Sequence, residues 1–265
     1  MNGYRVPAIA LMLLAGGGSA AAQTAQDFRW SGAVPAGQWV EVKGVNGGIR
    51  AEPSSGREVE VTAVKRAGER GEVEDVRIET VRHGDGVTVC AIYPSRRGRP
   101  ENRCTPGENW QVNNDDNDTQ VHFVVRVPRG VHFMGKTING GVEAERMPAN
   151  TFVSTVNGGV RVSAAGVVEA STVNGTIDAA TGSADPGRDL DFRTVNGDIN
   201  LRVPADFRAR VRAKLLNGNV SSDFPLNVTR GRYVGASADG EIGSGGRALD
   251  LETVNGSIRI RRAGS

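Results

Sequence analysis

The 265-residue chain is close to neutral, with 32 basic and 30 acidic residues and a formal net charge of +2. This balance argues against a dedicated nucleic-acid-binding protein, because such proteins carry a clear basic surplus. Glycine is frequent, with 36 residues, and short apolar runs alternate with turn residues. That pattern favours an all-β fold over a helical one.

The first 22 residues have the form of a secretory signal peptide. Arg5 supplies a positive charge, residues 6–14 are apolar, and three alanines end at Ala22. Small residues at this position are what signal peptidase requires, so we expect cleavage between Ala22 and Gln23. The apolar segment is shorter than the roughly 20 residues of a membrane span. The mature protein is therefore predicted to be exported, periplasmic or secreted, with no membrane span; an uncleaved anchor is the alternative.

Residues 23–130 are predicted to form an N-terminal β subdomain. Several longer strands are expected in it, and residues 121–127 alternate between apolar and polar side chains. Residues 95–119 are polar and lack an apolar period, so they are expected to form a long, mobile loop.

Two cysteines, Cys90 and Cys104, flank residues 91–103, a loop segment rich in Pro, Arg and Gly that overlaps the start of this polar stretch. An even cysteine count in an exported chain predicts a disulfide. Closing a loop of this size is worth about 3 kcal/mol in the chain-entropy description. Two free thiols are the alternative, and metal binding is disfavoured because no histidine lies within a ligand spacing of the pair.

Residues 131–265 are dominated by a repeat, in which an apolar residue, Asn-Gly, one variable residue and a branched apolar residue recur. From Asn139 onward the repeat advances in steps of 18, 17, 22 and 21 residues. Asn and Gly both tolerate positive φ, so each pair is predicted to be a structural turn. The seven pairs are Asn46-Gly47, Asn139-Gly140, Asn157-Gly158, Asn174-Gly175, Asn196-Gly197, Asn217-Gly218 and Asn255-Gly256.

Two architectures fit this repeat: an antiparallel β-roll of Asn-Gly hairpins, or a β-solenoid in which each Asn-Gly is a corner. A hairpin would place Thr194 opposite Ile199 and leave Val195 on the other face. The position of Val195 is apolar in every copy. We therefore favour the solenoid, with the apolar residues on both sides of the corner pointing inward. Stacked coils could also align Asn157, Asn174, Asn196 and Asn217 in a hydrogen-bonded ladder; the alternative is that the backbone of the turn alone requires these Asn residues.

The order of these motifs resembles the DUF4097 family of candidate adhesins. The likeness extends over residues 28–262: it begins with Phe28-Arg29-Trp30-Ser31-Gly32, continues through Val127-Pro128-Arg129-Gly130-Val131, and ends with Thr253-Val254-Asn255-Gly256-Ser257-Ile258. The resemblance implies one continuous unit, a bacterial envelope or secreted protein with a β-solenoid-like body. It implies no catalytic residues, and it implies binding through the surface. The cysteine-flanked loop departs from the family pattern.

Candidate chemistry is sparse. The three histidines, His83, His122 and His132, have no metal-ligand spacing, so no metal or cofactor is expected. The acidic run 115–118 could offer oxygen ligands to calcium, and the basic run 96–99 could meet an anionic glycan or lipid headgroup; a solvated loop is favoured for both.

Two functions follow from these observations. We expect a non-catalytic envelope protein, an adhesin-like binding or scaffold module for an unidentified glycan or protein. The alternative is a glycan-processing enzyme, a polysaccharide lyase or hydrolase on the same scaffold. Its carboxylates and cation would come from one turn, from Asp189, Asp191, Arg193 and Asp198. Strand alternation explains these four residues equally well as outward-facing positions.

Overall fold

The computed structural model describes residues 27–107, 110–231 and 235–264. The predicted signal peptide and its cleavage site lie outside the described residues. Within them the protein is all-β, with two sheets and one short 3-10 helix, η1 (Val73–Asp75). No helix in this part of the chain is long and apolar enough to cross a membrane.

The first sheet has ten strands, which are mostly parallel in its middle and antiparallel at one end. In spatial order they are β1 (Asp27–Gly32), β4 (Val59–Arg66), β7 (Gln120–Val127), β3 (Ile49–Pro53), β9 (Val142–Met147), β11 (Val160–Ala164), β13 (Ile177–Thr181), β15 (Ile199–Val203), β21 (Ile258–Arg262) and β17 (Val220–Ser222).

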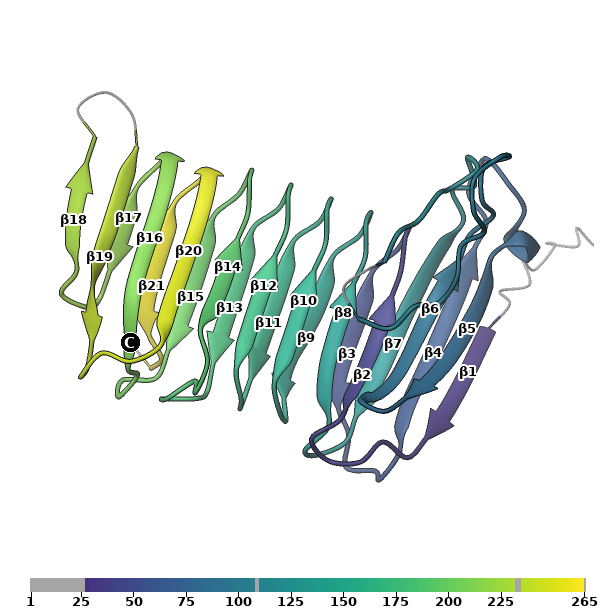
Figure 1. Cartoon of the computed structure of the whole chain (residues 1–265), viewed down its shortest axis with the longest axis horizontal. Coiled ribbons are helices and arrows are strands. Elements are labelled where there is room, and N and C mark those ends of the chain that lie inside the picture. The colour runs from purple at the N-terminus through teal and green to yellow at the C-terminus, as the bar shows by residue number, and fades with distance from the viewer. Residues whose placement is uncertain (1–26, 108–109, 232–234, 265) are drawn as a thin grey trace, which may run out of the picture.

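The second sheet has eleven strands and lies against the first along its whole length (Figure 1). In spatial order they are β18 (Asn227–Arg230), β19 (Ala236–Ile242), β16 (Ala209–Asn217), β20 (Ala248–Asn255), β14 (Leu190–Arg193), β12 (Val168–Ser171), β10 (Thr151–Ser154), β8 (His132–Lys136), β2 (Trp39–Lys43), β6 (Gly86–Ile92) and β5 (Arg77–His83).

Each coil of the repeat contributes one strand to each sheet. The strands before and after an Asn-Gly corner, such as β10 and β11, therefore belong to different sheets. Successive coils pair in parallel and in register, so that Val160 pairs with Ile177 and Ile177 with Ile199. The β-solenoid prediction is confirmed, and the hairpin alternative is wrong because the strands flanking each corner do not pair with each other.

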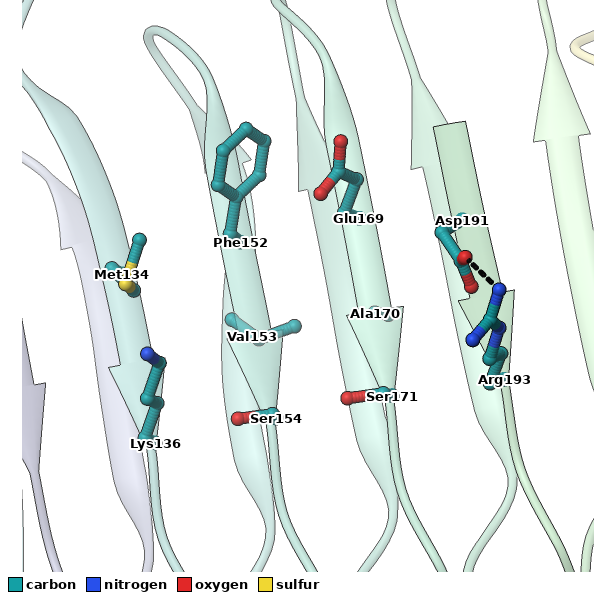
Figure 2. A pocket seen from close by; sticks show the side chains of 10 residues that line it. All are labelled: Met134, Lys136, Phe152, Val153, Ser154, Glu169, Ala170, Ser171, Asp191 and Arg193. Carbon is teal, nitrogen blue, oxygen red and sulfur yellow. Dashed lines mark ion pairs between the residues drawn. The ribbon is translucent and has the colours of Figure 1, made fainter. Parts of the chain in front are cut away.

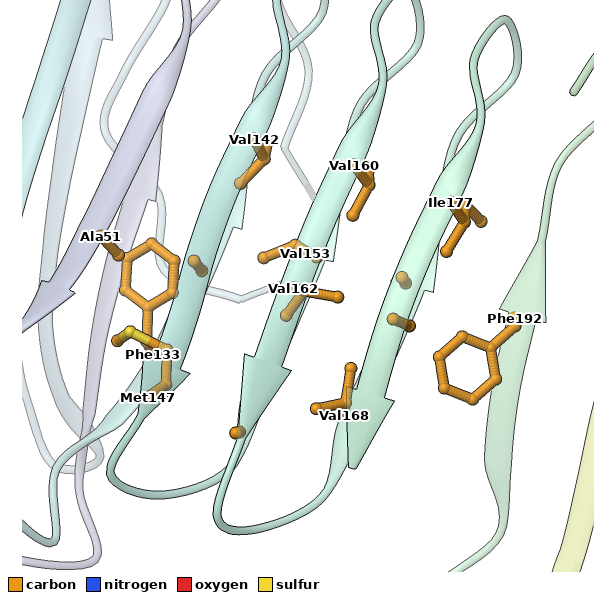
Figure 3. Close-up of a cluster of buried hydrophobic side chains, with 14 of the residues drawn as sticks. Ala51, Phe133, Val142, Met147, Val153, Val160, Val162, Val168, Ile177 and Phe192 are labelled. Atoms are coloured by element: carbon orange, nitrogen blue, oxygen red, sulfur yellow. The ribbon is translucent and has the colours of Figure 1, made fainter. Parts of the chain in front are cut away.

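The core lies between the two sheets and consists of the inward side chains of both. Phe133, Val142, Val160, Ile177 and Phe192 are at most 2% exposed and form part of one continuous apolar cluster (Figure 3). Because every coil adds its own inward residues to this cluster, no coil can bury its apolar face without its neighbours.

At most corners the apolar residue before the Asn does not point inward as expected; Val45, at the first corner, does and is 3% exposed. Val156, Val173, Val195 and Val254 are 36–39% exposed. Strand alternation continues into the corner, so the inward position goes to the preceding threonine, which is 2–5% exposed at Thr155, Thr172, Thr194 and Thr253. The prediction that both flanking apolar residues are buried holds at the first corner, for Val45 and Ile49, and at most of the others only for the residue after the corner.

Coil order in space differs from coil order in sequence at both ends of the solenoid. The last coil, β20–β21, lies between the β14–β15 and β16–β17 coils. Near the other end, the β2–β3 coil lies between β6–β7 and β8–β9. Antiparallel strands cap three of the four sheet edges: β18 and β19 at one end of the second sheet, β5 at its other end, and β1 and β4 at one end of the first sheet. The coil strand β17 is the edge strand at the other end of the first sheet. The parts predicted on either side of residue 130 contribute neighbouring strands to both sheets.

The cysteine-flanked segment packs against the second sheet, whereas a mobile loop was expected. A disulfide joins Cys90 of β6 to Cys104, as predicted for an exported chain. The buried ammonium group of Lys43, on β2, donates to the carbonyls of Thr105 and Gly107 at 2.6 Å each. Asn102 donates from its side chain to the carbonyls of Tyr93 and Asn113. These buried polar contacts hold the described part of the loop on the sheet.

Candidate ligand-binding groove

The Asn-Gly corners form a continuous side-chain ladder along one edge of the solenoid. Asn139 donates to Asn46, Asn157 to Asn139, and Asn174 to Asn157, at 2.8–2.9 Å. The series continues from Asn196 to Asn174, from Asn255 to Asn196 and from Asn217 to Asn255. The ladder expected from the sequence is present, but Asn255 lies between Asn196 and Asn217. Each rung fixes one coil against the next.

Glycine is required at these corners mainly because neighbouring coils approach closely. A Cβ on Gly197 would lie 2.0 Å from the carbonyl oxygen of Gly175, and one on Gly158 would lie 2.2 Å from that of Gly140. Positive φ is not the common reason, since Gly47, Gly140 and Gly218 have it among the seven corners. Among the described residues, the non-glycine positions with positive φ are Asp116 and Arg146, so no corner Asn has it. The turn chemistry inferred from the sequence is therefore corrected.

At five of the seven corners, a buried threonine two residues before the Asn satisfies a backbone carbonyl; Gly44 and Leu215 hold this position at the other two. The hydroxyl of Thr172 donates to the carbonyl oxygen of Gly158 at 3.0 Å, and Thr194 donates in the same way to Gly175. A buried carbonyl without a partner is costly, which explains why the inward position holds a hydroxyl at these five corners. The asparagine ladder and the buried threonines together hold neighbouring coils in register, so the strands are evenly spaced.

This scaffold carries a groove on the outer face of the second sheet. It crosses β8, β10, β12 and β14 and has a volume of about 500 Å³. Figure 2 shows two rows of outward side chains along it. One row contains Met134, Phe152, Glu169 and Asp191, and the other contains Lys136, Ser154, Ser171 and Arg193. Neighbouring strands lie about 4.8 Å apart, so four strands span about 14 Å.

The small side chains of the second row make the depression. Lys136 pairs with Ser154 in strand register, Ser154 with Ser171, and Ser171 with Arg193. Two serines therefore separate a lysine at one end from an arginine at the other. Both serines present hydroxyl groups, which donate and accept hydrogen bonds.

The carboxylates of the first row are held by arginines. Asp191 forms an ion pair with Arg193 at 2.6 Å, and Glu169 pairs with Arg188 at 3.1 Å. Burial raises the pKa of the Asp191 carboxyl above its ordinary value, although the guanidinium of Arg193 acts in the opposite direction. The guanidinium of Arg188 also lies 4.8 Å from the centre of the Phe152 ring.

The loop beside the disulfide closes the groove at its N-terminal end. Lys136 lies 3.6 Å from the carboxylate of Glu41 and donates weakly to the carbonyl of Gly107 at 3.4 Å. Glu41 also accepts from the backbone N–H of Gly107 and from the hydroxyl of Thr88. A second depression, of about 400 Å³, lies beside Trp39 and Met134. The outer face of the second sheet therefore carries both polar and apolar side chains on neighbouring strands.

The four residues proposed from the sequence for glycan chemistry do not form one cluster. Asp191 and Arg193 lie together in the groove, while Asp189 accepts from the backbone N–H of Ala248. Asp198 follows the corner on the first sheet and pairs with Arg259 at 2.7 Å. Hydrogen bonds from Arg259 and the Ser257 N–H hold the pKa of Asp198 below its ordinary value. The corner separates these carboxylates because it sends the chain from one sheet to the other.

The other candidate groups make local contacts. His132 packs against Trp39 with ring centres 4.8 Å apart, and His83 lies 3.1 Å from the Thr88 hydroxyl. In the acidic run, Asp116 and Asp118 both pair with Arg70. Within the described ranges, no three His, Cys, Asp or Glu side chains are grouped so as to hold a metal ion.

Sequence reasoning missed Lys136, Phe152 and Glu169 as groove residues. A signal was present for Phe152, because alternation in Thr151–Ser154 places a large aromatic side chain at an outward position. Glu169 and Lys136 carried no such signal, since a charged outward residue is ordinary in a β-sheet.

A family-level comparison decides the classification. The family described as Toastrack DUF4097 matches residues 108–261, more than half of the chain. The chain belongs to this family. Every residue that lines the groove lies within the DUF4097 match, whereas the disulfide and the first Asn-Gly corner precede it.

Two solved structures are similar to this DUF4097 chain, and no curated protein matches it. One is a candidate cell adhesion protein from Clostridium sporogenes, with 10% identity and a TM-score of 0.41, covering 90% of this chain and 100% of that one. The other is a candidate adhesin from Bacteroides fragilis, with 11% identity and a TM-score of 0.35, covering 90% and 97%.

Proposed function

We propose that the protein is an exported, non-catalytic binding module of the cell envelope, and that its groove holds a segment of a linear polysaccharide. The observation that carries this proposal is the pair of parallel rows across β8, β10, β12 and β14. They offer hydroxyl, carboxylate and cationic groups at the repeat distance of the strands. An extended glycan has hydroxyl groups along its length, and such a ligand matches a shallow, elongated site better than a compact molecule does.

Export is supported by two features. The N-terminal sequence has the form of a signal peptide, and the Cys90–Cys104 disulfide is the kind of bond that persists in oxidising compartments. A periplasmic or secreted location follows from the proposal. Mass spectrometry of protein recovered from the envelope tests it: the chain should begin at Gln23, and retention of Met1 would contradict the signal-peptide prediction.

Glycan binding is tested by filling the groove. Ser171→Trp places a bulky ring at its centre, and we expect it to abolish retention on envelope polysaccharide or on a glycan array. Ala180→Trp is the matched control, because Ala180 is an outward residue of β13 on the opposite sheet. Equal binding by both variants would place the ligand elsewhere, and no retention of the unmodified protein would remove the binding role.

A glycan-processing enzyme is the second candidate, and one observation favours it. Glu169 and Asp191 lie in one row on neighbouring strands, and burial raises the pKa of Asp191, as a general acid requires. Each carboxylate is nevertheless engaged by an arginine, which favours its charged form.

The two functions are separated by assaying new reducing ends or unsaturated products with peptidoglycan and other envelope polysaccharides. We expect no turnover. Turnover that Asp191→Asn or Glu169→Gln abolishes, with the fold intact by circular dichroism, would establish the enzyme instead.

A further inference from the structure

The last coil of the chain occupies a slot between two coils that precede it in sequence. In Figure 1, β20 lies between β14 and β16, and β21 lies between β15 and β17. Every strand pairing that joins the β14–β15 coil to the β16–β17 coil therefore passes through residues 248–262. The C-terminal cap, β16 to β19, is attached to the rest of both sheets through this coil.

The two neighbouring coils contact residues 248–262 along the full length of this last coil. Leu249, Leu251, Ile258 and Ile260 of the coil are at most 1% exposed. Its backbone pairs in parallel with a strand on each side in both sheets. At the corner, Thr253 donates to the Gly197 carbonyl, and Asn255 connects Asn196 to Asn217. The coil thus contributes most of its contacts to its two neighbours and few to the segment that leads into it.

That leading segment has the composition of a hinge. The connection between β19 and β20 contains Gly243, Gly245 and Gly246, all with positive φ, at 63°, 74° and 152°. Glycine reaches these and many other backbone conformations at little cost. If the backbone of this connection took another conformation and led the coil to a different molecule, the contacts that the coil makes in its slot would stay the same.

The opposite end of the solenoid has a comparable insertion, but a covalent bond secures it. The β2–β3 coil lies between two other coils, and the loop pinned by Cys90–Cys104 covers β2 through Lys43. Cys90 and Cys104 are the two cysteines of the sequence, so residues 248–262 are held by non-covalent contacts alone.

We propose that residues 248–262 exchange between two copies of this chain, each coil filling the slot of the other to form a dimer. The partner coil makes the same hydrogen bonds and buries the same side chains, so the monomer and the exchanged dimer differ mainly in the conformation of the glycine hinge. The protein concentration then sets the proportion of dimer. The exchange would also join the copies at the groove, because Glu252 of the coil lies 3.9 Å from Arg193.

The test mixes two variants of the full chain that each carry one added cysteine, Arg202→Cys and Arg261→Cys. Residues 202 and 261 are register partners on β15 and β21, so a disulfide between different chains requires one chain's coil to occupy the other's slot. The mixture is unfolded without reductant in acid, where the added thiols are protonated and do not attack Cys90–Cys104, and is refolded at high concentration by dilution to neutral pH. Dissolved oxygen then oxidises the two added thiols where they meet. We expect a crosslinked dimer on a non-reducing gel, with mass spectrometry locating the 202–261 bond.

The matched control mixes Arg161→Cys with Asp178→Cys, register partners on β11 and β13 that exchange does not separate. This mixture should give no inter-chain bond. Absence of the 202–261 bond, or equal crosslinking in both mixtures, would overturn the proposal. Circular dichroism of each variant verifies that the solenoid is retained. Shortening the hinge by deleting Ser244 and Gly245 is expected to increase the dimer further, because a strained connection favours exchange.

Discussion

The side-chain amide of Asn255 donates to the Oδ1 atom of Asn196 at 2.8 Å, although 59 residues separate the two in sequence. Asn217, which follows Asn196 more closely in the chain, instead donates to Asn255. The hydrogen bonds of the ladder therefore follow the order of the coils in space and not their order in the sequence. It also shows that one type of corner serves for both sequential and inserted coils.

The close approach at the corners predicts the effect of Gly197→Ala. The new Cβ would lie 2.0 Å from the Gly175 carbonyl oxygen, so the coils must separate locally. We expect a loss of about 1–3 kcal/mol in the free energy of unfolding, measured in urea. Gly159→Ala is the control, because its Cβ would lie 3.6 Å from its nearest neighbour, Thr176 O. Equal stability of the two variants would contradict the close-packing explanation.

The buried hydroxyl of Thr172 predicts a different pair of variants. Thr172→Val keeps the shape but leaves the Gly158 carbonyl without its donor, which we expect to cost about 1–3 kcal/mol. Thr172→Ser keeps the hydroxyl and should be the more stable of the two in thermal unfolding. A valine variant as stable as the unmodified protein would show that this carbonyl needs no side-chain donor.

Asp198 and Asp191 have pKa values shifted in opposite directions, and they predict opposite dependences of stability on pH. The pKa of Asp198 is lowered, mainly by the hydrogen bond from Arg259, so its stabilisation is present above the unfolded value of 3.8 and is lost as the pH falls through the lower folded pKa. Asp198→Asn should therefore lower the melting temperature at pH 7, and the difference should shrink in acid.

The pKa of Asp191 is shifted in the opposite direction, so its effect on stability is also opposite. Burial raises the pKa, so the folded state binds the proton more tightly and this carboxylate opposes folding once the pH is above its folded pKa. Asp191→Asn should melt at the same temperature as the unmodified protein or higher at pH 7. A clear loss of stability would show that the ion pair with Arg193 outweighs the cost of burial.

The disulfide predicts a stability change centred on its loop. Replacing Cys90 and Cys104 together by alanine should cost about 2–4 kcal/mol, because the bond constrains the unfolded chain. Limited proteolysis should cut between residues 91 and 107 sooner than in the unmodified protein. Unchanged cleavage would mean that the contacts of Lys43 with Thr105 and Gly107 suffice to hold the loop.

The sequence by itself was enough to predict the solenoid and the disulfide, and it suggested the Asn ladder. Each depends on local information: a corner motif at a repeating interval, an amide that can bond to a copy of itself, and two cysteines in a chain with an export signal. The exposure of Val195 was not predictable in this way, because burial at the corner is decided by the carbonyl of Gly175 that Thr194 must satisfy.

Only the tertiary structure decided which coils are neighbours and where the groove lies. All seven corners offer the same amide and glycine, and five of them offer the same threonine, so most coils are chemically compatible with one another and the repeat does not encode their order. The caps and the long connections place Asn255 between Asn196 and Asn217. The groove likewise requires Lys136, Ser154, Ser171 and Arg193, each an ordinary outward residue, to be brought into one row by the parallel register of four strands.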